Sequence, residues 1–229
     1  MDTFITNVTA VTMTPGAEVL FGVNIGITDG KIEFISKKVP EELPQTIIEG
    51  TGMVAMPGLI NCHTHLATSV LRCFTDDLSN KEALEALLQK EARMDSRSAK
   101  AAATLSIAEC LRFGVTSVSD LYYYPDATAK AVAETGIKGN LALSAYRFVD
   151  ECEEFDFETD EQCREFQRVV DKWHGFDNGR IKIDAGIYSE YTGNYPLWEA
   201  LAGYASEKGL GMQLHLSESQ NEVDSCLDR

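Results

Sequence analysis

The sequence has few basic residues and no long hydrophobic run, and each absence excludes a class of protein. Lysine and arginine number 20 against 36 aspartates and glutamates, which gives a net charge of −16. Such a charge argues against a nucleic-acid backbone or an anionic membrane surface as a partner. No apolar run approaches the roughly 18 to 20 residues of a membrane helix, and residues 1–10 do not resemble a secretion signal. We therefore expect a cytoplasmic protein.

Two sequence motifs are also missing. The six cysteines form no C-x-x-C pair, so in a chain without a secretion signal they are interpreted as scattered thiols rather than a disulfide framework. No G-x-G-x-x-G follows an early strand, which disfavours a dinucleotide-binding fold. The composition, with 44% hydrophobic and 24% charged residues, is typical of a globular protein with a packed core and excludes intrinsic disorder.

The first 55 residues predict a small β domain. Short apolar runs over residues 5–11, 19–27 and 32–35 are separated by turn-forming residues. Asp29-Gly30 between two alternating runs is a strong hairpin signal, because glycine tolerates the positive φ that a tight turn requires. We expect a small antiparallel sheet in this part of the chain.

From residue 56 onward, apolar runs alternate with helical patterns. Five β-like runs cover residues 59–62, 116–120, 140–145, 181–188 and 211–215. Helical stretches cover residues 81–93, 98–113, 127–134, 160–173 and 197–208, and a glycine suited to a left-handed helix end follows most of them. This alternation predicts an α/β fold with a parallel sheet, either doubly wound or closed into a barrel. A (β/α)₈ barrel takes about 250 residues, so this part of the chain would supply about five of its eight units.

Three of the four histidines fall at the ends of predicted strands. His63 and His65 form an H-x-H at the end of the run 59–62, and alternation along a strand places both on one face. Alone, this pattern is equally typical of two surface histidines. His215 closes the run 211–215 at the same edge. If the first and fifth strands of a barrel face each other, the three imidazoles can share zinc or another divalent ion.

Glu218 lies three residues past His215, where the chain leaves the strand. A carboxylate at this place can move protons between a metal-activated water and a substrate. The alternative is a carboxylate that only favours the dipole of the helix that follows. The fourth histidine, His174, ends a predicted helix and is interpreted as structural.

The motifs themselves resemble a known family. Residues 57–66 (PGLINCHTHL) resemble the opening motif of the amidohydrolase superfamily. Residues 71–78 (LRCFTDDL), 113–117 (FGVTS) and 215–219 (HLSES) resemble the S-adenosylhomocysteine and 5′-methylthioadenosine deaminases and their chlorohydrolase relatives. The motifs occur in the family's order over essentially the whole chain.

The resemblance implies a (β/α)₈ TIM-like, metal-dependent hydrolase barrel, here cut short after about five units, with a small β-sandwich. Residues 1–55 and 56–229 are then the expected domains. The implied reaction is hydrolytic deamination of a purine-like or other N-heterocyclic amine by metal-activated water. His63, His65 and His215 would ligate one divalent ion, zinc first, with iron, manganese or nickel as alternatives. Glu218 would transfer a proton to the ring nitrogen, and Glu82 would contact a ribose.

Two departures from the family pattern leave alternatives open. Tyr188 stands where relatives carry a substrate-contacting histidine, so the substrate need not be a standard adenosine derivative. The family's histidine from strand six and aspartate from strand eight would fall beyond Arg229, which makes the chain an incomplete enzyme. The alternatives are a non-catalytic metal-binding half-barrel that acts through assembly, and a hydrolase of amides, cyclic amides or chloro-heterocycles.

The expected partners follow from these interpretations. Arg147 lies near the end of a predicted strand and is a candidate contact for an anionic group of a small-molecule substrate, although an ion-paired or surface arginine fits equally well. A second copy of the chain or a missing C-terminal segment is the expected macromolecular partner.

Overall fold

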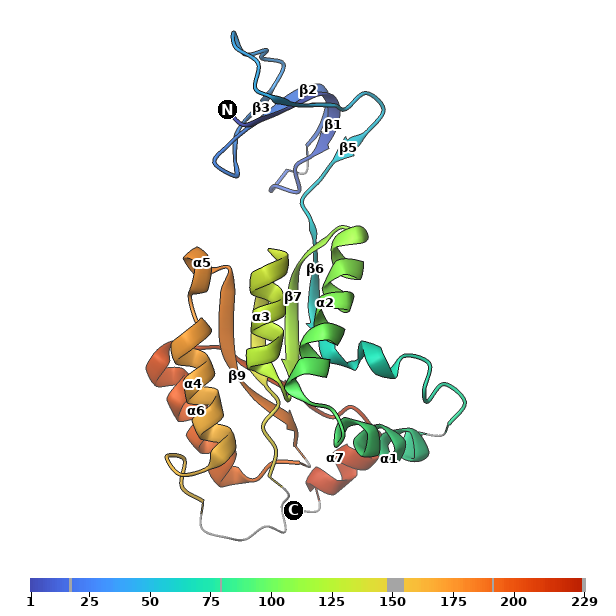
Figure 1. Cartoon of the computed structure of the whole chain (residues 1–229), viewed down its shortest axis with the longest axis vertical. Coiled ribbons are helices and arrows are strands. Elements are labelled where there is room, and N and C mark those ends of the chain that lie inside the picture. The colour runs from blue at the N-terminus through green and yellow to red at the C-terminus, as the bar shows by residue number, and fades with distance from the viewer. Residues whose placement is uncertain (17, 79, 148–154, 191, 228–229) are drawn as a thin grey trace. The chain divides into compact units, whose positions relative to one another are not determined.

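The computed structural model describes residues 1–16, 18–78, 80–147, 155–190 and 192–227 (Figure 1). The chain divides into two compact units, Met1–Gly58 and Leu59–Arg229, which are described here one at a time. Within the described ranges, no helix combines the length and the apolar character needed to cross a bilayer.

The N-terminal unit is a mixed β-sheet. Its strands are β1 (Thr3–Val11), β2 (Val19–Thr28), β3 (Lys31–Ser36), β4 (Thr46–Glu49) and β5 (Val54–Ala55). The first three pair antiparallel, as predicted, and the turn between β2 and β3 has positive φ at Asp29 (51°) and Gly30 (71°). The two short strands β4 and β5 pair parallel with β1, which the sequence did not indicate. Alternate residues of β1 and β2 form a small buried core.

The second unit alternates strands and helices. Its strands are β6 (Leu59–Thr64), β7 (Val115–Tyr122), β8 (Lys138–Leu143), β9 (Ile181–Ser189) and β10 (Met212–His215). Its helices are the 3₁₀ helix η1 (Leu66–Leu71), α1 (Asn80–Glu91), α2 (Ser96–Arg112), α3 (Pro125–Thr135), α4 (Glu161–Trp173), α5 (Phe176–Gly179), α6 (Tyr195–Lys208) and α7 (Gln220–Leu227). The predicted α/β fold is confirmed.

Local signals in the sequence account for most of these boundaries. Asp160 caps α4, because its carboxylate accepts the backbone N–H groups of Gln162 and Cys163, each at 3.0 Å. Gly136 and Gly209 end α3 and α6 in the left-handed conformation that glycine adopts without a steric penalty. Alternate residues of β7, β8 and β9, among them Val118, Leu141 and Ile183, are buried and form the main core with side chains of α4 and α6.

All five strands of this unit run parallel, in the order β10-β9-β8-β7-β6. In a flat sheet the two outer strands would lie about 19 Å apart, which is farther than two imidazole side chains can bridge. Yet Nε2 of His63, on β6, lies 3.2 Å from Nε2 of His215, on β10. The sheet is therefore curled like part of a barrel wall. Figure 1 shows α1 and α7 at the end of this unit where the strands terminate.

Candidate active site

His65 is the first residue after β6, and its imidazole is fixed from the neighbouring strand. Its Nδ1 lies 2.5 Å from the carbonyl oxygen of Leu121, on β7. Because a carbonyl can only accept, Nδ1 carries the proton and donates, and Nε2 keeps its lone pair for another partner. This is the common way in which proteins orient a metal-binding histidine.

His215, the last residue of β10, repeats this arrangement. Its Nδ1 donates to the carbonyl oxygen of Tyr188, on β9, at 2.5 Å, and its Nε2 lies 3.2 Å from Nε2 of His63. The candidate ligand atoms of His63, His65 and His215 all lie within 4.8 Å of one another, although the residues are up to 152 positions apart in the chain. The predicted convergence of the three histidines is thus present in the structure.

Electrostatics favour the neutral, metal-binding form of two of the three imidazoles. Partial burial lowers the pKa of His63, the charge of His215 lowers it further, and Glu218 opposes both. Burial likewise lowers the pKa of His65, against the hydrogen bond to the Leu121 carbonyl. A metal ligand must be a neutral imidazole. Three imidazoles with converging nitrogens are a donor set suited to zinc or a similar divalent ion.

Glu218 lies close to the cluster, since its charge acts on His63. It is exposed and precedes α7, which raises the alternative of a simple helix-capping role. That role belongs to Glu222, whose carboxylate accepts the Glu218 N–H at 2.9 Å and the Ser219 hydroxyl at 3.0 Å. The backbone of Ser217, between His215 and Glu218, has φ of +54°. The chain therefore bends sharply between His215 and Glu218.

A cavity of about 640 Å³ lies beside the cluster. Four tyrosines line it, Tyr123, Tyr124, Tyr146 and Tyr188, together with Glu91 and other residues. The Tyr123 and Tyr188 rings are stacked, with centroids 6.0 Å apart, and the Tyr188 ring lies 5.3 Å from that of His215. Aromatic rings therefore line part of the cavity, and one of them, Tyr188, lies against the ring of His215.

Of three consecutive tyrosines, two face this cavity and the first does not. Tyr122 is buried, and its hydroxyl donates to Glu91 at 2.6 Å. Burial raises the pKa of Glu91, and this hydrogen bond opposes the shift. Glu91 is a cavity residue that sequence reasoning missed. It lies in the last turn of a helix whose periodicity is weak, so no pattern in the sequence told which of its carboxylates faces inward.

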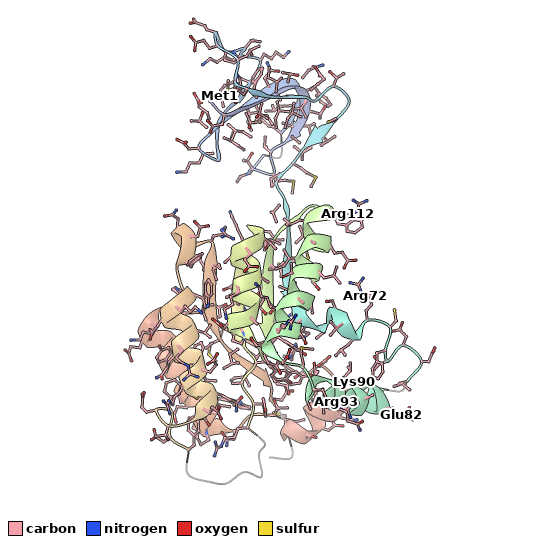
Figure 2. The ribbon with its side chains drawn as sticks, in the orientation of Figure 1. Met1, Arg72, Glu82, Lys90, Arg93 and Arg112 are labelled. Carbon is pink, nitrogen blue, oxygen red and sulfur yellow. The ribbon has the colours of Figure 1, made fainter. Side chains whose placement is uncertain are left out.

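The other predicted substrate contacts are placed differently. Glu82 lies in the first turn of α1 and is exposed (Figure 2), whereas α1 contributes Leu88 and Glu91 to the cavity wall. Arg147 pairs with Asp160 at 3.4 Å and lies over the Phe155 ring, with 14% of its side chain exposed. The pair with Asp160 agrees with the alternative that Arg147 is an ion-paired arginine. The structure brings the three histidines together, with the Tyr188 ring beside His215 and the charge of Glu218 acting on His63.

The remaining polar residues that the sequence singled out lie elsewhere. The His174 ring contacts the backbone of Ile183 through Nδ1, which agrees with a structural role. The cysteines that fall within the described residues, Cys62, Cys73, Cys110, Cys163 and Cys226, are free thiols, and Cys152 lies outside those residues.

Fold and site together define a class of protein: a barrel-type α/β protein with a place for a metal ion where its parallel strands end. A family model described as "Amidohydrolase family" matches residues 54–228. The chain therefore belongs to the amidohydrolase family.

The chain is also similar to individual named proteins. The chain is 34% identical over 235 residues to a 5-methylthioadenosine/S-adenosylhomocysteine deaminase of Caldicellulosiruptor saccharolyticus, with 100% of this chain and 52% of the relative covered. The chain spans about half the length of the curated relatives it matches.

Solved structures share the fold. A zinc-bound adenosine deaminase of Xanthomonas campestris superposes with a TM-score of 0.88 at 24% identity, over 100% of this chain and 52% of that one. An atrazine chlorohydrolase of Arthrobacter aurescens, complexed with zinc, has a TM-score of 0.79 at 23% identity, over 93% of this chain and 52% of the neighbour.

Proposed function

We propose that this chain carries the metal centre of a hydrolase that deaminates a purine-like amine. The observation that carries the proposal is the convergence of His63, His65 and His215 with Glu218 at the strand ends. The chain belongs to the amidohydrolase family, and the matched relatives are named as deaminases of adenosine-like compounds, which supports this substrate class.

The donor set supports a single divalent ion, with zinc as our choice. The ligand atoms of the three histidines are close enough to share one ion, and two of these imidazoles point Nε2 inward because Nδ1 is hydrogen-bonded. When bound, such an ion supplies the Lewis acidity that makes water a nucleophile near neutral pH.

In the proposed reaction, side chains of this chain bind and orient the substrate and move a proton. Glu218 delivers a proton to the ring nitrogen as the water oxygen bonds to the amine-bearing carbon, and it takes one proton of the water in return. The second water proton moves to the amino group, which leaves as ammonia when the C–N bond breaks and the new C=O bond forms. The phenol of Tyr188 donates a hydrogen bond to the substrate. Glu91, rather than Glu82, is our candidate for a carboxylate contact to a polar substituent, because it lines the cavity.

We also propose that further polypeptide completes the barrel and supplies the groups that the family resemblance assigns to later strands. In support, β6 and β10 are the edge strands of the curled sheet, and Ile60 and Leu214 on them are 68% and 47% exposed. A continuation of the same chain or a second chain would fit.

The test is ammonia release from 5′-methylthioadenosine and related aminopurines, measured on the zinc-loaded 229-residue chain and on the longest polypeptide that contains it. The Glu218→Gln variant is the matched control. It should bind zinc like the unmodified protein and lose turnover by at least about 100-fold. Zinc binding without turnover of any aminopurine or triazine, in either polypeptide, would refute the proposal.

A second candidate is hydrolysis of a chloro- or amino-triazine, and Tyr188 is the observation that favours it. A tyrosine is bulkier than the histidine expected at this place and offers a phenol hydroxyl in place of an imidazole. Adding a chloro-triazine and an amino-triazine as substrates decides between the two candidates, because chloride or ammonia release from each triazine is compared with ammonia release from 5′-methylthioadenosine on the same sample.

A further inference from the structure

Two buried carboxylates lie beside the backbone that follows two of the clustered histidines. Asp120, on β7, and Glu190, just after β9, are 2% and 3% exposed. Oδ1 of Asp120 accepts the N–H of Leu66 at 2.6 Å, and Oε1 of Glu190 accepts the N–H of Ser217 at 2.8 Å. Leu66 directly follows His65, and Ser217 lies two residues past His215.

The two contacts belong to a repeated arrangement. The strand beside each histidine makes two bonds to the same short segment: a main-chain carbonyl, of Leu121 or Tyr188, holds the imidazole Nδ1, and a carboxylate holds the backbone that follows. Asp120 immediately precedes Leu121, and Glu190 lies two residues past Tyr188. One bond fixes the ring, and the other fixes the direction in which the chain leaves it.

Each carboxylate is itself held in place. Asp120 sits in the β6–β7–β8 ladder, opposite Thr64 and Leu141. Glu190 lies in a turn closed by Ser189 and Thr192, where the Ser189 N–H donates to the Thr192 hydroxyl at 3.1 Å and the Thr192 N–H to the Ser189 carbonyl at 3.3 Å. A rigid acceptor can position a backbone, whereas a mobile surface carboxylate cannot.

The Glu190 contact also bears on Glu218. Ser217 has φ of +54°, a conformation that a residue with a side chain adopts only when its surroundings require it. The Glu190 bond holds this residue between His215 and Glu218. Loss of the bond would therefore free both the imidazole and the carboxylate to move apart.

We propose that Asp120 and Glu190 are positioning residues of the metal centre: through the N–H groups of Leu66 and Ser217 they hold His65 and His215 in the geometry that binds a divalent ion. This inference rests on the proposed metal centre. Burial raises the pKa of Asp120 to about 7 against the Leu66 hydrogen bond, and both its ionised and its neutral form offer an oxygen that the N–H can use.

The test measures zinc affinity by competition with a chromophoric chelator, using the 229-residue chain and zinc alone. Asp120→Ala and Glu190→Ala should each weaken zinc binding by about 10-fold or more, the size of effect typical of groups that orient ligands. Asp120→Asn and Glu190→Gln keep an oxygen acceptor and should lose less. Asp184→Ala is the matched control, because Asp184 is a partly buried carboxylate of β9 that bonds Asn140, Gly211 and Gln213 and does not bond the backbone that follows a clustered histidine.

A spectroscopic measurement separates positioning from general stability. In the cobalt-loaded protein, the visible absorption reports the ligand geometry and should change in both alanine variants but not in Asp184→Ala. Alanine variants that fold and match the unmodified protein in affinity and spectrum would overturn the inference. If one alanine variant does not fold, the alanine variant at the other carboxylate decides, and an affinity and a spectrum equal to those of the unmodified protein overturn the inference. Failure of the unmodified chain to bind zinc would instead refute the metal centre itself.

Discussion

Asp126 provides the sharpest prediction about stability, because three donors converge on one carboxylate. It lies in the first turn of α3 and accepts hydrogen bonds from Lys130 at 2.6 Å, Lys172 at 2.7 Å and the indole N–H of Trp173 at 2.8 Å. Lys172 and Trp173 end α4, so the carboxylate connects two helices that cover the sheet. At this position the negative charge of Asp126 also interacts favourably with the positive end of the α3 dipole.

The magnitude follows from the shift in pKa. Partial burial opposes ionisation of Asp126, but the hydrogen bonds outweigh it and lower the pKa from 3.8 to about 2. At 1.36 kcal/mol per pKa unit, and with a side chain that is 25% exposed, this is worth about 2 kcal/mol of folding free energy. Because the folded-state pKa is depressed, the contribution is present above pH 4 and is lost as the pH falls toward 2.

The assay is urea unfolding of the unmodified chain and Asp126→Asn, followed by circular dichroism between pH 3 and pH 7. We expect the variant to be about 2 kcal/mol less stable at pH 7, with the difference shrinking below pH 4. Asp177→Asn is the control, since Asp177 is 49% exposed and its pair with Arg180 should contribute under about 1 kcal/mol. A difference at pH 7 no larger than that of the control, or one that persists undiminished at pH 3, would refute the reasoning.

Three further predictions concern the site. Zinc at 100 times its Kd should stabilise the chain against unfolding by about 2.7 kcal/mol, and His65→Ala should abolish this gain in a thermal melt. Because the pKa values of His63 and His65 are lowered, both rings should titrate below the ordinary imidazole pKa of about 6.5 in the metal-free chain, and an NMR pH titration that finds either ring at or above that value would contradict this. Tyr122→Phe should cost about 1 to 3 kcal/mol in urea unfolding, because Glu91 loses a buried hydrogen bond, and an unchanged stability would contradict the assigned contact.

The sequence was most informative where a local signal was repeated. The five parallel strands and the helices between them begin and end within a few residues of their predicted bounds, because apolar runs, caps and glycines agree at each boundary. Short elements escaped prediction: β4, β5 and α5 span two to four residues, too few to show a period. The histidine cluster was predictable because strand ends in a parallel sheet share one edge.

The substrate contacts stay predictions, and spacing along the chain does not choose among the candidates. Glu82 and Glu91 lie on one helix, but Glu91 lines the cavity and accepts the Tyr122 hydroxyl, whereas Glu82 is exposed. Arg147 lies near a strand end, as predicted, but Asp160 lies close enough to pair with it. Spacing along the chain identifies which residues reach the edge of the sheet. It does not identify which partner a long charged side chain selects there.

Tyr188 contacts the histidine cluster and the cavity through different groups. Its carbonyl oxygen holds the His215 imidazole, and its ring lines the cavity. The carbonyl belongs to the backbone of β9, so its bond to His215 does not depend on the identity of the side chain. A change of side chain at this position can therefore alter the cavity while the histidine stays oriented. We infer that the tyrosine at this place, unexpected by resemblance, alters which substrate is accepted rather than whether a metal is bound.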